Sequence, residues 1–255
     1  MYAQERQQAM ARLVTERRRL SVTALAEEYD VTTETVRRDL SQLERLGLVR
    51  RVHGGAVPAG SLSSIEAGLG ERSATNSEQK DAIAQAALGE LPPDGSTLLF
   101  DAGTTTARLA AALPHDCRFV VFTHAVPVAG RLAGLPQIEL HLLPGRVRPA
   151  TQAAVGAETV AALSRLRVDT VFLGTNAISH GHGLSTPDAD EAAIKRALVA
   201  SARRVVVLAD SSKLGCESVI SFASLDEIDC LVTDDGVTDD DRRALEAAGI
   251  DVVVA

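Results

Sequence analysis

Hydrophobic and polar positions alternate with helical spacing over the first fifty residues. Residues 4–15 predict one helix, and residues 22–29 predict a second helix with Ser21 as its N-cap. Only residues 30–32 separate it from a third helix, for which Thr32 is the expected N-cap. The apolar positions of this third helix, spaced four, three and three residues apart, are Val36, Leu40, Leu43 and Leu46. Helix, tight turn, helix is the helix-turn-helix pattern, in which the second helix enters the major groove of DNA.

The segment after the third helix predicts a small β-hairpin. Gly47 stands where a left-handed C-cap would end the helix. Residues 48–57 then predict two short strands around a Gly-Gly turn, with Arg50 and Arg51 near the start of the hairpin. His53 either closes this turn or contacts the DNA backbone. Such a hairpin is the wing of a winged helix-turn-helix domain, predicted here over residues 1–57.

The third helix leaves polar side chains outward on its early turns if its apolar side faces the core. These outward positions are Thr33, Thr35, Arg37, Arg38 and Ser41. Hydroxyl and guanidinium groups suit contacts with phosphates and base edges, and the helix N-terminus itself favours a phosphate. Asp39 is expected to orient the neighbouring arginines or to cap a neighbour. The pattern leaves an alternative open, a small three-helix bundle whose arginines only form a solvated face.

The pattern changes in the rest of the chain. Residues 58–76 are rich in Gly, Ser and Ala, lack a clear period and are predicted as a linker, and a helix is expected from Ser77 to Leu88. Strands are predicted at residues 97–100, 119–122, 138–143, 170–173, 204–208, 230–233 and 251–254. Strands that alternate with helical stretches predict an α/β domain on a mostly parallel sheet over residues 77–255.

Polar residues follow several of the predicted strands, where parallel sheets bind their ligands. The candidate effector-binding residues are Asp101, Gly103, Thr104, Thr105, Thr106, Thr123, His124, Gly145, Arg146, Gly174, Asp210, Ser212 and Lys213. A glycine followed by hydroxyls at a helix N-terminus offers several donors and the positive end of the helix dipole to a phosphate. Alternatively, the hydroxyls are N-caps only, and Asp101 and Asp210 hold loop amides.

Composition and charge narrow the class of protein. The 255 residues carry a net charge of −8, yet residues 1–57 hold ten arginines, no lysine and eight acidic residues, and the remainder carries −10. A slightly basic part joined to an acidic body is expected when only one part meets phosphate. No apolar run approaches the roughly 20 residues that span a bilayer, and no signal-peptide pattern is present. The three cysteines form no C-x-x-C pair, so we expect a cytoplasmic protein with reduced thiols, no metal and no cofactor.

Long motifs resemble the DeoR family of bacterial repressors. In the N-terminal part they are VTTETVRRDL at 31–40 and LGLVRRVHGGA at 46–56. Segments that resemble the sensor domain of the same family are DAGTTT at 101–106, VDTVFLG at 168–174, GLSTPD at 183–188 and ADSSKLG at 209–215. The resemblance covers nearly the whole chain. His124 stands where the family often has Asn, and Pro144 where it usually has Gly, so His124 is expected to tune which sugar is accepted.

The resemblance implies a DNA-binding transcriptional repressor of a sugar-utilisation operon, released from its operator by a sugar phosphate. It assigns DNA contacts to Thr33, Thr35, Arg37, Arg38, Arg50 and Arg51. It also implies a sensor domain similar in fold to ribose-5-phosphate isomerase. Likeness to regulators beside fructose-uptake genes favours fructose 1-phosphate as effector. The expected partners are double-stranded operator DNA, the effector and further copies of the chain in a dimer or tetramer, because one winged helix makes too few contacts for tight specific binding.

Two rival functions belong to other classes. A sugar-phosphate isomerase-like enzyme with an accessory DNA-binding domain would need proton transfer, for which Asp188, Asp190, Glu191 and Lys195 are charged enough. However, Glu191 and Lys195 stand four residues apart on one predicted helix, the spacing of an ordinary surface salt bridge. We therefore expect no catalytic residue. A binder of single-stranded nucleic acid would present aromatic side chains for stacking, and the outward face of the N-terminal helices has essentially none.

Overall fold

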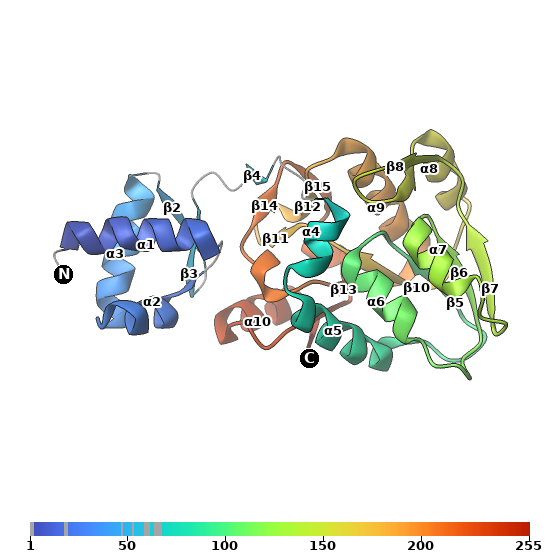
Figure 1. Ribbon diagram of the computed structural model, residues 1–255, viewed down its shortest axis with the longest axis horizontal. Helices are drawn as coiled ribbons and strands as arrows, with labels where there is room; N and C mark the ends of the chain where they lie inside the picture. The colour runs from blue at the N-terminus through green and yellow to red at the C-terminus, as the bar shows by residue number, and fades with distance from the viewer. Residues whose placement is uncertain (1–2, 18–19, 47, 53, 59–61, 64–67) are drawn as a thin grey trace.

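The computed structural model describes residues 3–17, 20–46, 48–52, 54–58, 62–63 and 68–255. Of residues 4, 50, 52, 62 and 63 the backbone alone is described. Figure 1 shows two units beside each other along the longest axis, a small helical one at the N-terminus and a larger α/β one. This is the fold class that the sequence predicts.

The N-terminal unit is a helix-turn-helix with a three-stranded antiparallel sheet. Its elements are α1 (Ala3–Arg17), β1 (Leu20–Ser21), α2 (Val22–Tyr29), α3 (Thr33–Arg45), β2 (Val49–Val52) and β3 (Gly55–Pro58). The predicted N-caps are confirmed, because the Ser21 side chain accepts from the Ala24 amide and the Thr32 side chain accepts from the Thr35 amide. Asp30 takes a left-handed conformation, with φ of 48°, which closes the turn between α2 and α3.

The apolar side of α3 forms the core of this unit. Val36, Leu40 and Leu43 are at most 1% exposed and pack in one cluster with Met10 of α1 and Leu25 of α2. The exception is the last of the spaced apolar positions. Leu46 is the C-cap of α3 and is 59% exposed. Gly47 and His53, for which the sequence predicted a helix cap and a turn, lie outside the described residues.

The C-terminal unit is built on a seven-stranded parallel sheet, in the order β17-β16-β13-β10-β5-β6-β7. Its strands are β5 (Thr97–Phe100), β6 (Phe119–Thr123), β7 (Ile138–Leu142), β10 (Val168–Gly174), β13 (Ala202–Leu208), β16 (Cys230–Thr233) and β17 (Asp251–Val254). Each of the seven predicted strands is therefore confirmed. The five inner strands are largely buried on both faces, as is usual for parallel strands, whereas the edge strands β7 and β17 carry exposed residues.

Helices cover both faces of this sheet. The helices packed on one face are α5 (Ser77–Ala86), which continues as a 3₁₀ turn at Ala87–Glu90, α6 (Thr104–Ala112) and α7 (Val126–Leu132). Those on the other face are α8 (Ala157–Leu163), α9 (Ala189–Ser201) and α10 (Asp239–Ala247). Leu98 and Phe100 enter the first cluster and Leu99 enters the second, as the alternation along a strand dictates.

The order of the strands reverses between β5 and β10. From β5 the chain moves outward through β6 to β7, and it then returns to place β10 on the other side of β5, followed by β13, β16 and β17. The loops after β5 and β10 therefore leave toward opposite faces of the sheet. In open α/β sheets such a reversal leaves a crevice beyond the carboxyl ends of the two strands, where ligands bind.

Several short elements were not predicted from the sequence. They are α4 (Leu69–Ala74), the pair β4 (Leu62–Ser63) and β14 (Glu217–Ser218), the hairpin β8 (Arg146–Arg148) and β9 (Ala153–Val155), the sheet β11 (Ala177–Ser179), β12 (Gly183–Thr186) and β15 (Ile220–Ala223), and 3₁₀ turns at Ser211–Lys213 and Leu225–Glu227. The predicted linker thus contains a helix. With six residues, α4 is too short to show a helical period, and tertiary contacts hold it instead.

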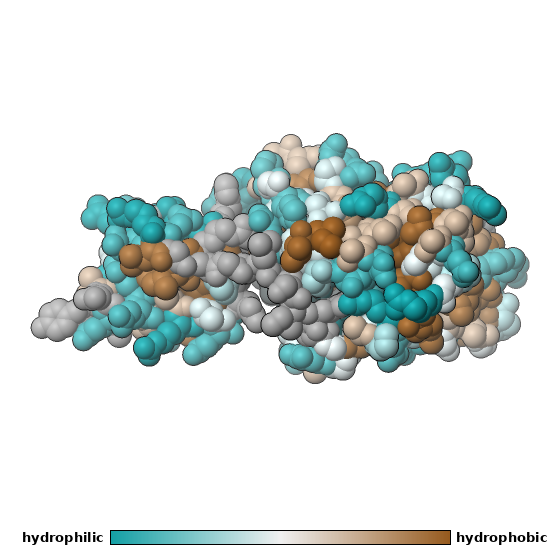
Figure 2. Space-filling model, turned by 90° about the horizontal axis from the view of Figure 1, so that it is seen from above, coloured by the Kyte–Doolittle hydropathy of each residue, from teal (hydrophilic) through white to brown (hydrophobic). Residues whose placement is uncertain are grey.

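The surface of both units is mixed. Figure 2 shows hydrophilic side chains interspersed with smaller hydrophobic patches on the face that it displays. Within the described ranges, no helix has the length and apolar character needed to cross a bilayer.

Candidate DNA-binding surface and effector pocket

The early turns of α3 carry exposed arginines. The side chains of Arg37 and Arg38 are 55% and 82% exposed, and Thr33 beside them is exposed as well. Both guanidinium groups lie near the Glu34 carboxylate, at 3.6 and 3.7 Å. Exposed pairs of this kind contribute at most about 1 kcal/mol, so the guanidinium groups can turn to a phosphate or a base edge at little cost.

The wing is tied to α3. Arg51 donates from Nη1 to the Ser41 hydroxyl at 2.7 Å, and its backbone amide donates to Glu44 Oε1 at 2.9 Å. Thr35 is half-buried, and its hydroxyl lies 2.9 Å from that of Thr32. Arg50 lies on β2, and its side chain is outside the described part of the structure. The wing and the start of α3 together form a surface rich in guanidinium and hydroxyl groups, which we call the α3–wing surface.

Asp39 has a different role from the one expected. Its side chain is 6% exposed, and its carboxylate accepts hydrogen bonds at 2.7 Å from Arg6 Nε and from Gln7 Nε2 of α1. The prediction that Asp39 orients its neighbours Arg37 and Arg38 was wrong. Asp39 follows Val36 by three residues and therefore lies on the inner side of α3, where it joins α3 to α1.

A pocket of about 470 Å³ opens at the carboxyl ends of β5, β10 and β13, at the reversal of strand order. The predicted effector residues that line it are Gly103, Thr104, Thr105, Thr106, Gly174, Asp210, Ser212 and Lys213. Residues 103–106 form the N-terminus of α6, where the first backbone amides have no partner within the helix. The free amides of this helix N-terminus, the threonine hydroxyls and Lys213 are hydrogen-bond donors, and the helix dipole points its positive end at the pocket. Together they suit an anion.

Further residues line the pocket beside the predicted effector residues. They are Arg72, Asn76, Lys80, Thr175 and Asn176, among others. Asn76 donates from Nδ2 to Asp210 Oδ1 at 2.9 Å, which fixes that carboxylate at the pocket wall. In the sequence, Lys80 resembles any polar residue of an amphipathic helix, and only the packing of α5 against the sheet and of α4 against α6 reveals its burial.

Lys80 is a buried cation beside the pocket. It is 6% exposed, and its ammonium donates to the Thr75 carbonyl at 2.6 Å and to the Arg72 carbonyl. Burial lowers the pKa of Lys80 to about 8; the nearby Asp210 carboxylate opposes this shift, and Lys213 and Arg108 add to it. A phosphate in the pocket would favour the charged form of Lys80.

Asp101 lies beneath the pocket and does not line it. It is fully buried, and its Oδ2 accepts from the Gly174 amide at 2.9 Å and from the Lys195 ammonium. Lys195 also donates to the Gly174 carbonyl at 2.8 Å. Burial alone would raise the pKa of Asp101, but the Lys195 ammonium and the His124 hydrogen bond lower it to about 2. The Asp101–Lys195 pair thus clamps both backbone groups of Gly174, which form part of the pocket floor.

Thr123 and His124 are fully buried near the same floor. Thr123 donates its hydroxyl to the Phe100 carbonyl at 2.9 Å. His124 Nδ1 lies 2.9 Å from the Ala154 carbonyl oxygen, and His124 Nε2 lies 3.2 Å from both Asp101 Oδ1 and the Ala102 amide nitrogen. Neither residue lines the pocket, so any influence of His124 on ligand choice acts through the backbone of the 101–106 loop.

Gly145 and Arg146 also lie away from the pocket. Gly145 has φ of 141° and packs so closely on Thr159 that a Cβ would stand 2.2 Å from its hydroxyl. Arg146 is exposed and pairs with Asp190 at 2.9 Å. Both residues follow β7, which is separated from β10 by β5 and β6.

The prediction that Glu191 and Lys195 form a surface salt bridge was wrong. They are 2% and 4% exposed, because α9 packs both against the parallel sheet and against the small sheet of β12 and β15. Glu191 accepts from the Thr151 hydroxyl at 2.5 Å, and Lys195 turns toward Asp101. Asp188 is the N-cap of α9 and accepts from the Glu191 amide at 3.0 Å.

Residues of the N-terminal unit also line this larger pocket. Glu16 and Arg17, from the last turn of α1, and Pro58, the last residue of β3, contribute to its wall. The two units also approach each other at Gly54, where a Cβ would stand 3.4 Å from the hydroxyl of Thr238, the N-cap of α10. A ligand in the pocket would therefore lie against both units.

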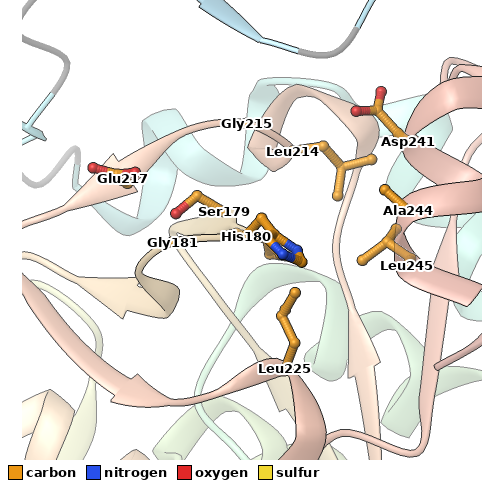
Figure 3. A pocket seen from close by; sticks show the side chains of 11 residues that line it. Ser179, His180, Gly181, Leu214, Gly215, Glu217, Leu225, Asp241, Ala244 and Leu245 are labelled. Atoms are coloured by element: carbon orange, nitrogen blue, oxygen red, sulfur yellow. The ribbon is translucent and has the colours of Figure 1, made fainter. Parts of the chain in front are cut away.

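A second pocket, of about 220 Å³, lies between β11, the segment after Lys213 and α10. Figure 3 shows the side chains of Leu214, Leu225, Leu245 and His180 around it. Its described lining includes the acidic side chains of Glu217 and Asp241 but neither lysine nor arginine. A phosphate would find no cationic partner among those residues, so the larger pocket is the better candidate for an anionic effector.

Comparisons with known proteins give one match for the N-terminal unit and another for the C-terminal unit. Residues 6–61 match the DeoR-like helix-turn-helix domain, and residues 75–235 match the DeoR C terminal sensor domain. The HTH-type transcriptional regulator GlpR of Haloferax volcanii is 40% identical over 99% of this chain and 98% of its own length. The glycerol-3-phosphate regulon repressor of Escherichia coli (strain K12) is 32% identical over 90% of each chain. A solved ribose 5-phosphate isomerase from Methanocaldococcus jannaschii matches with a TM-score of 0.41 and 18% identity over 55% of each chain.

Proposed function

The chain belongs to the DeoR family of transcriptional regulators, and on that premise we propose that it represses a carbohydrate-utilisation operon until a sugar phosphate releases it. In this proposal the α3–wing surface holds double-stranded operator DNA in the cytoplasm. The larger pocket binds the effector. Residues 1–57 act as the DNA-binding domain, 58–76 as the connection and 77–255 as the sensor.

The observation that carries the proposal is the composition of the larger pocket. The N-terminus of α6 and the residues Thr104, Thr105, Lys80 and Lys213 line one space. Backbone amides at a helix N-terminus together with lysine form a strong site for a phosphate group. Arg17 and Arg72 line the same space, so four cationic side chains stand there beside the acidic Glu16, Glu71, Asp210 and Glu217.

The other polar groups of the pocket suit the hydroxyls of a polyol. Asp210 supplies a carboxylate, and Asn76 and Asn176 supply amides. Carboxylates and amides are the usual partners of hydroxyl groups because together they accept and donate. Fructose 1-phosphate remains our first choice of effector. Glycerol 3-phosphate is the second, since the Escherichia coli relative bears the name of a glycerol-3-phosphate regulon repressor.

The route from effector to DNA passes through the wall that the two units share. Because Glu16, Arg17 and Pro58 line the pocket, a ligand there changes the contacts of the N-terminal unit as well as those of the sensor. Release follows if the effector binds more tightly when the N-terminal units do not match the spacing of the operator half-sites. Paired units on paired half-sites require a homo-oligomer, which is part of the proposal.

The proposed function includes no catalytic activity. The ammonium of Lys195 is committed to Asp101 and to the Gly174 carbonyl and does not line the pocket. An isomerase needs a proton-transfer group at its substrate, and the residues weighed for that role, Asp188, Asp190, Glu191 and Lys195, do not line the pocket. Turnover of any sugar phosphate by the purified protein would contradict this part of the proposal.

A thermal-shift screen tests the effector claim. The panel contains fructose 1-phosphate, fructose 6-phosphate, glycerol 3-phosphate, inorganic phosphate and unphosphorylated fructose. A ligand that binds only the folded protein raises the free energy of unfolding, by about 2.7 kcal/mol at a hundredfold excess over its Kd. The melting temperature rises with it. We expect one phosphorylated compound to stabilise the protein far more than phosphate or free fructose does.

Release from DNA is measured next, by fluorescence anisotropy with a duplex selected from random sequences. The stabilising compound is expected to weaken operator binding at the concentrations at which it raises the melting temperature. If no phosphorylated compound changes either quantity, the sensing proposal fails. If the protein selects no duplex at all, the repressor proposal fails as well.

A further inference from the structure

One cation of the larger pocket belongs to the DNA-binding unit. Arg17, in the last turn of α1, is exposed and lines the pocket together with Lys80 and Lys213 of the sensor. Within the described part of the chain, the side chains of Arg17 and Lys213 make no hydrogen bond or ion pair, whereas the Lys80 ammonium already donates to two backbone carbonyls. A phosphate in the pocket therefore finds an uncommitted guanidinium group on its N-terminal side.

The connection between the units keeps the DNA-binding unit near this pocket. Strand β4, which begins at Leu62, pairs with β14 of the sensor, and Glu217 of β14 lines the pocket. Only residues 59–61 separate Leu62 from Pro58, the last residue of β3. Four Cα-to-Cα steps span at most about 14 Å. While β4 stays paired, Pro58 therefore cannot move far from the wall that it forms here.

The wing turn also touches the sensor. Gly54 follows β2 with φ of 75°, and a Cβ there would stand 3.4 Å from the hydroxyl of Thr238. Thr238 is the N-cap of α10, whose first turn carries Asp239, Asp240 and Asp241. DNA at the wing would bring its phosphates toward these carboxylates, and such a juxtaposition of like charges costs affinity. The arrangement of the two units in this structure, which we call the docked arrangement, is therefore unfavourable for DNA binding.

We propose that Arg17 binds the phosphate group of the effector, so that the effector holds the DNA-binding unit on the sensor in the docked arrangement. The inference rests on the proposed function, since it adds a ligand from the other unit to the same pocket. Arginine suits this role because its planar fork binds phosphate oxygens bidentately.

The docked arrangement then has the higher affinity for the effector. Only a docked chain offers the Arg17 guanidinium to the pocket, and a chain whose N-terminal unit has moved to DNA does not. By linkage, an effector that prefers the docked arrangement increases its population and lowers the affinity for the operator. This assigns the differential contact that release from DNA requires to a single named side chain.

Calorimetric titration of the full chain with fructose 1-phosphate and with glycerol 3-phosphate tests the role of Arg17. For each compound that the parent binds, Arg17→Ala is expected to lower the affinity about tenfold, the effect of one lost charge-assisted hydrogen bond. Arg17→Lys keeps the charge without the fork and should recover part of the loss. Arg12→Ala is the matched control, because Arg12 is exposed on the same helix and does not line the pocket. It should leave the affinity unchanged.

Disulfide trapping tests the docked arrangement. A Cβ at Gly54 would stand 3.8 Å from the Cβ of Thr238, a separation that a disulfide spans. The variant with Gly54→Cys and Thr238→Cys is expected to form an intramolecular disulfide under mild oxidation, faster when fructose 1-phosphate or glycerol 3-phosphate is bound. The oxidised protein should bind the selected duplex roughly tenfold more weakly than the reduced protein does. The two single-cysteine variants report cross-links through native cysteines, and circular dichroism checks that every variant is folded.

Loss of effector affinity in Arg17→Ala but not in Arg12→Ala, with faster disulfide formation in the presence of the compound, supports the inference. It is overturned if Arg17→Ala binds the compound as tightly as the parent does. It is also overturned if the folded double-cysteine variant forms no disulfide, or if its oxidised form binds the duplex as tightly as its reduced form. If the double variant does not fold, the calorimetric result decides.

These outcomes separate the inference from the proposed function on which it rests. A parent that binds a sugar phosphate while Arg17→Ala binds it equally well keeps the effector pocket and removes only the role of Arg17. A parent that binds no compound of the panel removes the sensing proposal, and this inference fails with it. The calorimetric arm needs no DNA, so its result does not depend on the operator claim.

Discussion

The two units of this protein place their charged groups in opposite ways. On α3, Arg37 and Arg38 are more than half exposed and make only loose pairs with Glu34. Under the sensor pocket, Asp101 and Lys195 are buried and bonded to each other and to Gly174. Exposed cations remain available to a polyanion, whereas buried ions must satisfy one another and so hold a shape. Substitutions on α3 should therefore change binding and leave stability alone, and substitutions under the pocket should do the reverse.

The largest effect is expected for Asp101→Ala. It leaves the Lys195 ammonium buried without its counter-ion, which costs about 3–5 kcal/mol. For a chain of this size that corresponds to a fall in melting temperature of roughly 10 °C by calorimetry. The double variant Asp101→Ala with Lys195→Met should recover part of the loss, because no charge remains buried. Equal melting temperatures for the single variant and the parent would show that the Asp101–Lys195 pair does not stabilise the fold.

The same pair predicts a response to acid. The pKa of Asp101 falls from its ordinary 3.8 to about 2 in the folded chain. The ionised carboxylate therefore stabilises the folded state fully above pH 3.8, and this stabilisation is lost as the pH falls toward 2. Urea unfolding between pH 5 and pH 2 measures it. Lys195→Met, which lacks the ammonium, should lose less stability over this interval than the parent does.

Lys213→Ala should act on the effector alone. A charge-assisted hydrogen bond contributes about 1.5–3 kcal/mol, so the affinity for the effector should fall roughly tenfold to a hundredfold. Operator affinity without effector should not change, because Lys213 is on the sensor. Anisotropy titrations with and without effector measure both, and Lys213→Arg serves as the control that keeps the charge. An unchanged effector response would remove Lys213 from the site.

Arg37→Ala should weaken operator binding about tenfold, the usual effect of one lost contact to a base or phosphate. If the lost contact is to a phosphate, the slope of log affinity against log salt should also decrease by about one. The matched control is Arg243→Ala on α10, an arginine that is 72% exposed on the sensor. The melting temperatures of both variants should equal that of the parent. Similar losses of DNA affinity in both would refute the α3–wing surface.

The smallest effect is expected from the titration of Lys80. Its pKa of about 8 means that its charge is lost as the pH rises from 7 to 9, while an effector phosphate stays dianionic. Effector affinity should therefore decrease over this interval, by less than about tenfold. Lys80→Arg keeps its charge throughout and should abolish the decrease. A parent whose affinity is constant from pH 7 to pH 9 would exclude Lys80 as a phosphate partner.

Much of the local structure followed from the chain itself. Ser21 and Thr32 cap their helices as predicted, because a hydroxyl before an apolar helical period satisfies the first free amides wherever it occurs. The strands were predicted for a similar reason, since an apolar run such as 205–208 is typical of an inner strand that a parallel sheet buries on both faces. Helix α4 and the buried state of Lys80, Glu191 and Lys195 could not be predicted, because they depend on neighbours distant in sequence.

What the sequence by itself determined is the set of elements and the polar residues at their ends. What only the tertiary structure decided is which ends meet. Placement of β10 and β13 on one side of β5 joins residues 103–106 to Gly174 and to 210–213, and it leaves the residues after β6 and β7 outside the pocket. Strand order depends on how the connecting helices pack across the sheet, and no local pattern along the chain encodes contacts between segments so far apart.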